Sequence, residues 1–319
     1  MPYPPLHIAI PSFVLSERTQ KVLQSCSSQL TINTGPRPNQ EQLRILLEKH
    51  EHLIIGIKER INPSIFQGLN LKTKLLGTLS IGTDHLDLEA CKAAGITVVN
   101  APTANVTSVA EHTLSLLLAL RKQFKDSNNA VRSGQGRKGL DKWPRDLRGM
   151  TVGLVGAGRI AYETAKYLHF FGVQLKGWTF RPDQHPEFEP FGLQWVNNLE
   201  ELFTSCDAVS LHLPFTPATE NLITLELLSS IQHRPFHFIN TSRAELVAKD
   251  ALPKAMKQGL VDAVGLDVLR EDESWEDYPE ERSYLSPHVA GVTDESLERL
   301  SFELATRMAD SILKTSQLR

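Results

Sequence analysis

Short apolar runs alternate with amphipathic segments along most of the chain. In the first hundred residues the apolar runs have the length of buried strands, whereas the segments between them space their apolar residues as helices do. The pattern predicts strands at 6–10, 53–57, 75–79 and 96–99, and helices at 17–25, 40–49 and 86–94. This alternation is typical of a parallel sheet covered by helices.

A longer helix signal follows, and with it the predicted domain junction. Ser108 and Glu111 have the spacing of a capping box ahead of a leucine-rich stretch, and the polar, glycine-rich region 126–148 is expected to be an excursion before the second domain. From residue 151 the alternation resumes, with strands expected at 151–155, 173–179, 208–213, 237–241 and 263–267, helices at 159–171, 225–231 and 248–258, and a closing helix at 294–313. This second alternation predicts a doubly wound sheet.

Length and composition narrow the functional class. A chain of 319 residues exceeds one ordinary core, so two domains are expected. The net charge of −3 and a pI near 6.4 indicate no general attraction to nucleic acid or anionic membranes. The uncharged apolar run 113–120 is too short to span a bilayer, and the first residues lack the pattern of a secretion signal.

Three isolated cysteines suggest a cytoplasmic protein. Cys26, Cys91 and Cys206 are odd in number and have neither a disulfide framework nor zinc-ligand spacing, so no metal site is expected. One of them could be a reactive thiol, but small buried apolar side chains are the favoured interpretation.

A glycine-rich turn follows the predicted strand at 151–155. Gly156 suits a tight turn, Gly158 would let the backbone approach a diphosphate, and Ala161 is small enough for close packing of helix on strand. Arg159 and Ile160 begin the next helix, whose positive N-terminus attracts phosphate. A strand before the turn and a helix after it favour dinucleotide binding.

The residues at the end of the next strand predict which dinucleotide the chain binds. A site for NAD usually places Asp or Glu there to bind the ribose 2′-hydroxyl. This chain has Thr179 and Arg181, and no acid before Asp183. Because a carboxylate would repel a 2′-phosphate and an arginine would attract it, NADP is expected in preference to NAD. The alternative is that Arg181 is only a solvated surface charge.

Two later residues have the chemistry needed to reduce a 2-keto acid. Arg243 follows an apolar strand, at the carboxyl edge where such sheets bind ligands, and its planar guanidinium can hold a carboxylate. His288 follows Pro287, and a histidine side chain titrates close to the pH at which proton transfer must occur. Acidic residues in 267–273 could favour the charged imidazolium.

Several motifs together resemble the D-isomer-specific 2-hydroxyacid dehydrogenase family, and in particular its glyoxylate and hydroxypyruvate reductases. Those motifs are the segments 81–87, 100–102, 105–111, 211–219, 240–243 and 286–288. The resemblance covers nearly the whole chain. It implies two doubly wound α/β domains: a flavodoxin-like substrate domain, residues 1–102 plus 292–319, and a Rossmann dinucleotide-binding domain, residues 103–291. It also implies a homodimer built mainly through the cofactor domains.

The resemblance also implies roles for individual residues. Arg243 would clamp the substrate and His288 would donate the proton, with a supporting acid expected at Asp272. The loops at Lys58 and at Ile81–Gly82 would bind the substrate carboxylate. Besides the glycine-rich turn, the cofactor contacts would be Thr179, Arg181, His212, Leu213, Pro214, Thr219, Thr241 and Asp267, the last holding the nicotinamide carboxamide.

Two departures leave alternatives open. The family usually has Glu where this chain has the shorter Asp272, so Glu271 or Glu273 could support His288 instead. The run 271–282 is longer and more charged than the family pattern. The predicted reaction is reduction of a small 2-keto acid with NADPH. The alternatives are an NAD-dependent phosphoglycerate-type dehydrogenase, formate or phosphite oxidation, and a nucleotide-sensing protein without turnover. The long, regulated phosphoglycerate dehydrogenases are disfavoured because no further domain follows Arg319.

Overall fold

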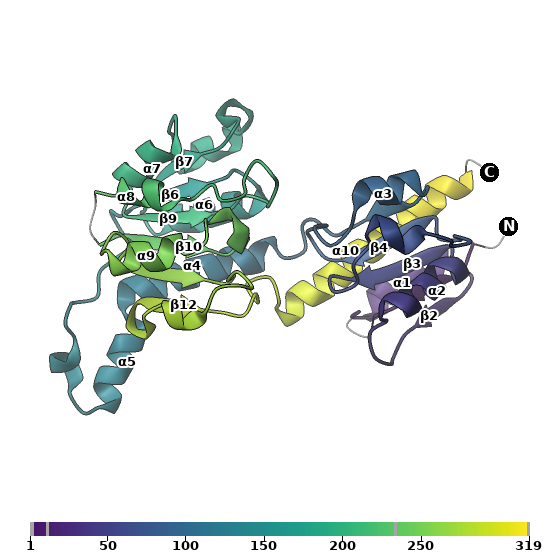
Figure 1. The fold of residues 1–319 in the computed structure, drawn as a ribbon, viewed down its shortest axis with the longest axis horizontal. Helices are drawn as coiled ribbons and strands as arrows, with labels where there is room; N and C mark the ends of the chain where they lie inside the picture. Colours follow the sequence, from purple (N-terminus) through teal and green to yellow (C-terminus); the bar gives the residue numbers. More distant parts are fainter. Residues whose placement is uncertain (1–2, 11–12, 233–234, 318–319) are drawn as a thin grey trace. The chain divides into compact units, whose positions relative to one another are not determined.

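The computed structural model describes residues 3–10, 13–232 and 235–317. The chain divides into two compact units (Figure 1). The first unit comprises Met1–Asn105 and Val292–Arg319, and the second comprises Val106–Gly291. Each unit contains one parallel sheet, which confirms the predicted α/β class.

The sheet of the first unit has the strand order β2-β1-β3-β4-β5, with every pair parallel. This is the flavodoxin-like order 2-1-3-4-5. The strands are β1 (Leu6–Ile8), β2 (Leu30–Ile32), β3 (His52–Gly56), β4 (Leu75–Leu79) and β5 (Thr97–Val99). β2 was not predicted, because its three residues are only partly buried and include an exposed threonine, so they lack a continuous apolar run.

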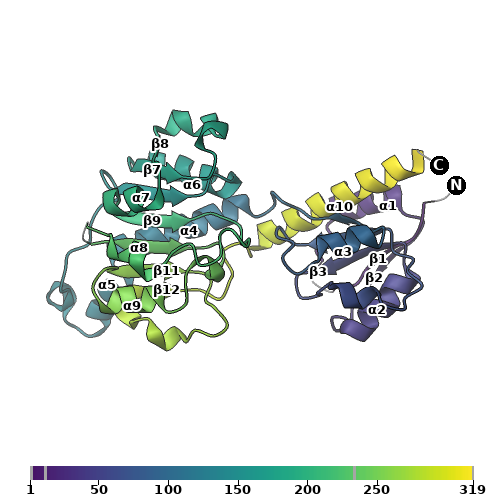
Figure 2. The ribbon, with the colours of Figure 1, turned by 45° about the horizontal axis from the view of Figure 1, so that its top comes forward.

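Helices cover both faces of this sheet. They are α1 (Glu17–Cys26), α2 (Gln40–Lys49), α3 (Leu88–Ala93) and α10 (Asp294–Gln317), with the short helix η1 (Pro63–Phe66) after β3. Figure 2 shows α10 beside α1, where Arg18 pairs with Glu298 and stacks on the ring of Phe302. Leu304 and Met308 of α10 are fully buried in the same apolar cluster as β1. The closing helix is therefore part of the core of the first unit.

The sheet of the second unit has seven parallel strands in the order β12-β11-β10-β9-β6-β7-β8. They are β6 (Thr151–Val155), β7 (Gln174–Trp178), β8 (Gln194–Trp195), β9 (Ala208–Leu211), β10 (His237–Asn240), β11 (Ala263–Leu266) and β12 (Ser283–Leu285). The chain reverses direction across the sheet between β6 and β9, which is the switch point where doubly wound sheets bind ligands. β8 and β12 at the edges were too short to be predicted.

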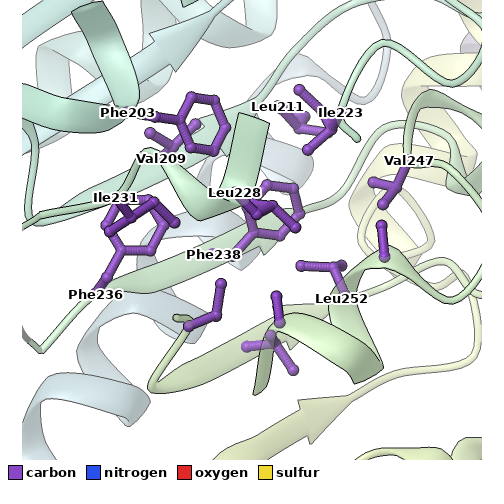
Figure 3. Close-up of a cluster of buried hydrophobic side chains, with 14 of the residues drawn as sticks. Phe203, Val209, Leu211, Ile223, Leu228, Ile231, Phe236, Phe238, Val247 and Leu252 are labelled. Atoms are coloured by element: carbon purple, nitrogen blue, oxygen red, sulfur yellow. The ribbon is translucent and has the colours of Figure 1, made fainter. Parts of the chain in front are cut away.

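Two apolar clusters sandwich this sheet. One face is covered by α4 (Val106–Lys122) and α6 (Arg159–Phe170), whose leucines pack on β6 and β7. The other is covered by α7 (Leu199–Ser205), α8 (Leu225–Ser229) and α9 (Ala251–Lys257). Figure 3 shows this second cluster, with the rings of Phe203 and Phe236 stacked. Burial of these faces is what holds the unit together.

One prediction about the start of the second unit was wrong. α4 begins at Val106, so Ser108 lies buried inside the helix and is not its N-cap. The polar region 126–148, expected to be an excursion before the second domain, overlaps helix α5 (Phe124–Arg132) and contains the short helix η2 (Gly136–Gly139). Five further short helices lie in loops: η3 (Pro182–Gln184) and η4 (Pro186–Phe191), then η5 (Ala244–Leu246), η6 (Trp275–Asp277) and η7 (Glu280–Arg282).

Candidate active site

The glycine-rich turn connects β6 to α6 and requires glycine at its first position. Gly156 has φ +110°, and a Cβ there would lie 2.6 Å from the carbonyl oxygen of His212. Gly158 is the N-cap of α6 and makes no side-chain cap, and a Cβ there would meet no other atom within 4 Å. The space beside Gly158 is therefore open, and the positive N-terminus of a helix next to such space suits an anionic diphosphate.

The residues predicted to select the cofactor lie beside this turn. The amide of Gly156 donates to the carbonyl oxygen of Trp178 over 2.8 Å, and Trp178 ends β7. Thr179 follows and is half-buried, whereas Arg181 is exposed. The end of β7 thus carries a hydroxyl and a nearby guanidinium, and the first acidic residue after it is Asp183.

A buried histidine follows β9 on the other side of the turn. His212 is 8% exposed, and neither ring nitrogen has a hydrogen-bond partner among the described residues. Burial lowers the pKa of His212 to about 4, so its ring is neutral at physiological pH. Leu213 is buried and Pro214 exposed; Thr219 donates to the carbonyl oxygen of Pro214 over 2.8 Å and so shapes the loop after this strand.

Arg243 lies in a hydrogen-bonded turn after β10. The side chain of Asn240 accepts from the amide of Ser242 and donates to the carbonyl oxygen of Arg243, both over 2.9 Å. The hydroxyl of Thr241 lies 2.9 Å from that of Thr113 in α4. These contacts fix the backbone on both sides of Arg243, whose own side chain is half-buried. A guanidinium in such a setting can bind a planar carboxylate in two places.

His288 lies in the loop after β12 and has an exposed side chain. Its φ is +56°, a left-handed conformation that is uncommon for a residue with a side chain. The amide of His288 donates to the carbonyl oxygens of Asp267 and Ser286 over 2.8 and 3.1 Å. An exposed imidazole on a constrained backbone can exchange a proton with a bound molecule.

Asp267, after β11, is fully buried and holds this loop. Its carboxylate accepts from the hydroxyl of Ser286 and from the amides of Val289 and Ala290, over 2.5, 2.9 and 2.8 Å. Three of its roughly four acceptor sites are therefore used within the protein. One acceptor site is left for a further donor, such as the nicotinamide carboxamide that the family resemblance implies.

Two of the acidic residues expected near His288 contact other residues. The Asp272 carboxylate lies 2.8 Å from the ammonium of Lys249 and 3.5 Å from the guanidinium of Arg270. The hydrogen bond from Lys249 lowers the pKa of the Asp272 carboxyl. Glu273 accepts from the amide of Asp250, and Glu271 is exposed. Within the described residues, none of the three acids is brought into contact with His288.

The predicted substrate loops lie in the first unit. Lys58 is exposed after β3, beside the buried Glu59, whose carboxylate accepts from the amide of Gly56 over 2.8 Å. In the second loop, the hydroxyl of Ser80 donates to the carbonyl oxygen of Gly82 over 2.7 Å. The side chain of Asn100 donates to the carbonyl oxygen of Ile81 over 2.6 Å. Both loops are therefore held by buried or half-buried side chains.

Sequence reasoning missed two residues of the second unit. Nε2 of His112, in α4, lies 2.9 Å from the hydroxyl of Ser286 and 3.8 Å from Oδ1 of Asp267. Ser286 was noted only as part of a motif, and His112 was not singled out. The two lie 174 residues apart in sequence, so no local pattern could pair them.

Other classes of site receive no support from the described residues. The three cysteines are buried free thiols, as expected, and burial raises the pKa of Cys26 and of Cys91 to about 11 and that of Cys206 to about 12. Over the described ranges, no group of three or more His, Cys, Asp or Glu side chains could hold a metal ion. None of the described helices is long and apolar enough to cross a membrane.

The comparison with protein families matches the model described as "D-isomer specific 2-hydroxyacid dehydrogenase, NAD binding domain" over residues 114–290. The glyoxylate reductase of Thermofilum pendens is 31% identical over 284 residues, which cover 87% of this chain and 82% of that protein. Phosphoglycerate dehydrogenases also match. The chain covers 43% of the Arabidopsis thaliana protein and 64% of the Haemophilus influenzae protein.

Two solved structures illustrate the likeness in fold. The D-lactate dehydrogenase of Aquifex aeolicus, solved with NAD and lactic acid, has a TM-score of 0.81 at 27% identity and covers 98% of this chain and 96% of its own. The acyclic imino acid reductase Bsp5, solved with NADPH and D-Arg, has a TM-score of 0.84 at 24% identity and covers 97% of each chain. One neighbour holds NAD and the other NADPH.

Proposed function

Because the chain belongs to the D-isomer-specific 2-hydroxyacid dehydrogenase family, we propose that it reduces a small 2-keto acid to the D-2-hydroxy acid. The observation that carries the proposal is a shared sheet edge. Gly156, Arg243 and His288 follow the carboxyl ends of β6, β10 and β12, three strands of one parallel sheet. Ligands of doubly wound sheets bind at this edge.

The residues present fit a nicotinamide dinucleotide. The cradle at Gly156 has no room for a Cβ, and the uncapped start of α6 offers amides to a diphosphate. When bound, the cofactor supplies the hydride that C2 of the keto acid accepts. We assign the walls of its site to the turn and to the loops after β7, β9 and β10.

Proton and charge movements are assigned to two side chains. Arg243 holds the substrate carboxylate through paired N–H···O bonds. The His288 imidazolium gives its proton to the carbonyl oxygen as C2 is reduced, which leaves a hydroxyl on the product and a neutral ring on the enzyme. The amides near Lys58 and Ile81–Gly82 are proposed to bind a substrate carboxylate, as the family resemblance implies. Their fixed loops support this assignment.

The first test is oxidation of NADPH and NADH with glyoxylate, hydroxypyruvate, pyruvate and bulkier 2-keto acids. Turnover is expected with at least one short keto acid. His288→Gln is expected to lower kcat by at least about 100-fold, since general acid catalysis contributes 10²–10⁴. Arg243→Lys is expected to lower kcat/KM because the paired geometry is lost. Near-normal turnover by His288→Gln would contradict the proposed mechanism.

We propose NADPH as the preferred cofactor. Thr179 and Arg181 support this choice, because the end of β7 carries no carboxylate to repel a 2′-phosphate. The measurement is kcat/KM for NADPH against NADH at one keto acid concentration. Equal values would remove the preference while leaving the reaction class intact.

A phosphoglycerate-type, NAD-dependent reaction is the second candidate. The specific observation in its favour is the match to phosphoglycerate dehydrogenases, one of them 31% identical over 269 residues. Oxidation of 3-phosphoglycerate with NAD separates the two candidates, since the first proposal expects no reaction with that substrate.

We further propose a cytoplasmic homodimer formed through the second unit. A cavity of about 830 Å³ lies beside α5 and η2, and its wall includes Arg121 and His237, each with a buried nitrogen lacking a partner among the described residues. Trp143 lines the same cavity and is 66% exposed. A second copy covering this surface would bury Trp143 and close the cavity that these nitrogens line. Sedimentation of the wild type and of Trp143→Glu tests the proposal, which expects the variant to dissociate.

A further inference from the structure

The loop that carries His288 depends on a hydrogen-bonded carboxylate beneath it. Asp267 is fully buried, and it binds the hydroxyl of Ser286 and the amides of Val289 and Ala290. These three donors flank His288 on both sides. Because His288 has a left-handed φ, its backbone conformation depends on surrounding contacts and not on local preference.

The direction of the hydrogen bonds follows from the chemistry of the groups. A carboxylate can only accept, so the hydroxyl of Ser286 gives its one proton to Asp267. That hydroxyl must then accept from Nε2 of His112, which lies 2.9 Å away. His112 therefore carries a proton on Nε2, and the three side chains form a relay that runs from His112 through Ser286 to Asp267.

The relay begins at His112, which is held within a helix. His112 is in α4, and the next residue, Thr113, donates to the carbonyl oxygen of Val109 over 2.8 Å. Thr113 also contacts Thr241, two residues before Arg243. Neighbouring residues of one helix thus contact the segment that carries each proposed catalytic side chain.

We propose that His112 is a positioning residue for the reaction. Through Ser286 and Asp267 it holds the backbone at 286–290 in the conformation that presents the His288 imidazole. This inference rests on the proposed function only for what His288 does. The relay itself is a property of the protein without ligands, so it can be tested without turnover.

The first experiment is amide hydrogen exchange in the ligand-free full chain, followed on peptides that cover Val289 and Ala290. His112→Ala and Ser286→Ala are each expected to speed exchange there by about 2- to 10-fold, the effect of one net hydrogen bond. The double variant should match Ser286→Ala alone, because both changes break the same relay. Ser115→Ala, on the same helix with an exposed side chain, is the control and should leave the loop unchanged.

A second readout separates positioning from general stability. His112→Ala should lower kcat by about 2- to 10-fold with little change in the KM for cofactor, and His112→Gln should restore it, because the glutamine amide can donate to Ser286. A merely structural contact would change the unfolding midpoint without this kcat effect or its rescue.

Two results would overturn the relay. One is unchanged exchange and kcat in both single variants, and the other is additive effects in the double variant. Failure of the proposed function looks different: the wild type would reduce no 2-keto acid, while the exchange experiment would still report on the loop.

Discussion

Replacing Gly156 with alanine tests the cofactor turn directly. The added Cβ would lie 2.6 Å from the carbonyl oxygen and 2.8 Å from the carbonyl carbon of His212, both backbone atoms of the neighbouring strand end. It would also lie 3.1 Å from Leu213 Cδ2. The φ of +110° adds strain, because an L side chain rarely adopts it. Neither problem can be relieved by a side-chain rotation.

The expected cost has three parts. Backbone strain of this kind costs about 1–3 kcal/mol, and forcing a methyl group into a packed site costs about 1–3 kcal/mol. Alanine also lowers the entropy of the unfolded chain, which offsets about 0.4–1 kcal/mol of this cost. The free energy of unfolding should therefore fall by about 1–5.5 kcal/mol, a large share of the ordinary 5–15 kcal/mol.

Urea unfolding followed by tryptophan fluorescence is the assay. All four tryptophans, at positions 143, 178, 195 and 275, lie in the second unit, so their signal reports that unit alone. Gly158→Ala is the matched control, because its Cβ would meet no atom within 4 Å. It should change the free energy of unfolding by less than about 1 kcal/mol. It should nevertheless weaken NADPH binding, because the methyl group points where a diphosphate is proposed to lie. Equal unfolding midpoints for Gly156→Ala and the wild type would refute the reasoning.

Three further predictions concern cofactor choice, the role of one acid and pH. Thr179→Asp should reverse the cofactor preference toward NADH, measured as the ratio of kcat/KM values, because the carboxylate repels a 2′-phosphate and accepts from a ribose hydroxyl. Asp272→Asn should leave kcat and its pH profile within about twofold of the wild type, because this carboxylate contacts Lys249 and not His288; a large loss would restore the sequence-based role. The pKa of His237 is lowered by burial to about 3, so the unfolded chain takes up a proton from about pH 6.5 downward while the folded chain does not. The free energy of unfolding of the second unit should thus fall by roughly 1.4 kcal/mol for each pH unit below about 6. In acid unfolding curves, His237→Leu should reduce this slope.

The periodic parts of the fold could be predicted from the sequence, because burial on both faces leaves a continuous apolar run in a parallel strand. The strands at 75–79 and 151–155 were predicted to the residue. The edge strands β2, β8 and β12 were missed, because two or three residues are too few to show the hydrophobic pattern of a strand. The start of α4 was misplaced because a Ser-x-x-Glu spacing also occurs inside helices, where tertiary burial decides.

Some residues of the candidate site could likewise be predicted from the sequence, and others could not. Gly156, Arg243 and His288 could be selected as candidates from the sequence, because a turn requiring glycine and residues directly after apolar strands leave local signals. The support of His288 could not be found, because it depends on contacts between distant segments. Sequence spacing suggested Asp272, but in the structure that carboxylate pairs with Lys249.

Local periodicity and the chemistry of single residues were enough to predict the two parallel sheets, the glycine-rich turn and the residue types at the sheet edge. Only the tertiary structure shows that Asp267 is fully buried and that its carboxylate accepts hydrogen bonds from the backbone next to His288. It also brings His112 into contact with Ser286, which lies 174 residues away in sequence. Hydrogen bonds between distant segments form only once the sheet has brought its strand ends to one edge. Their geometry is therefore a property of the packed fold and not of any stretch of sequence.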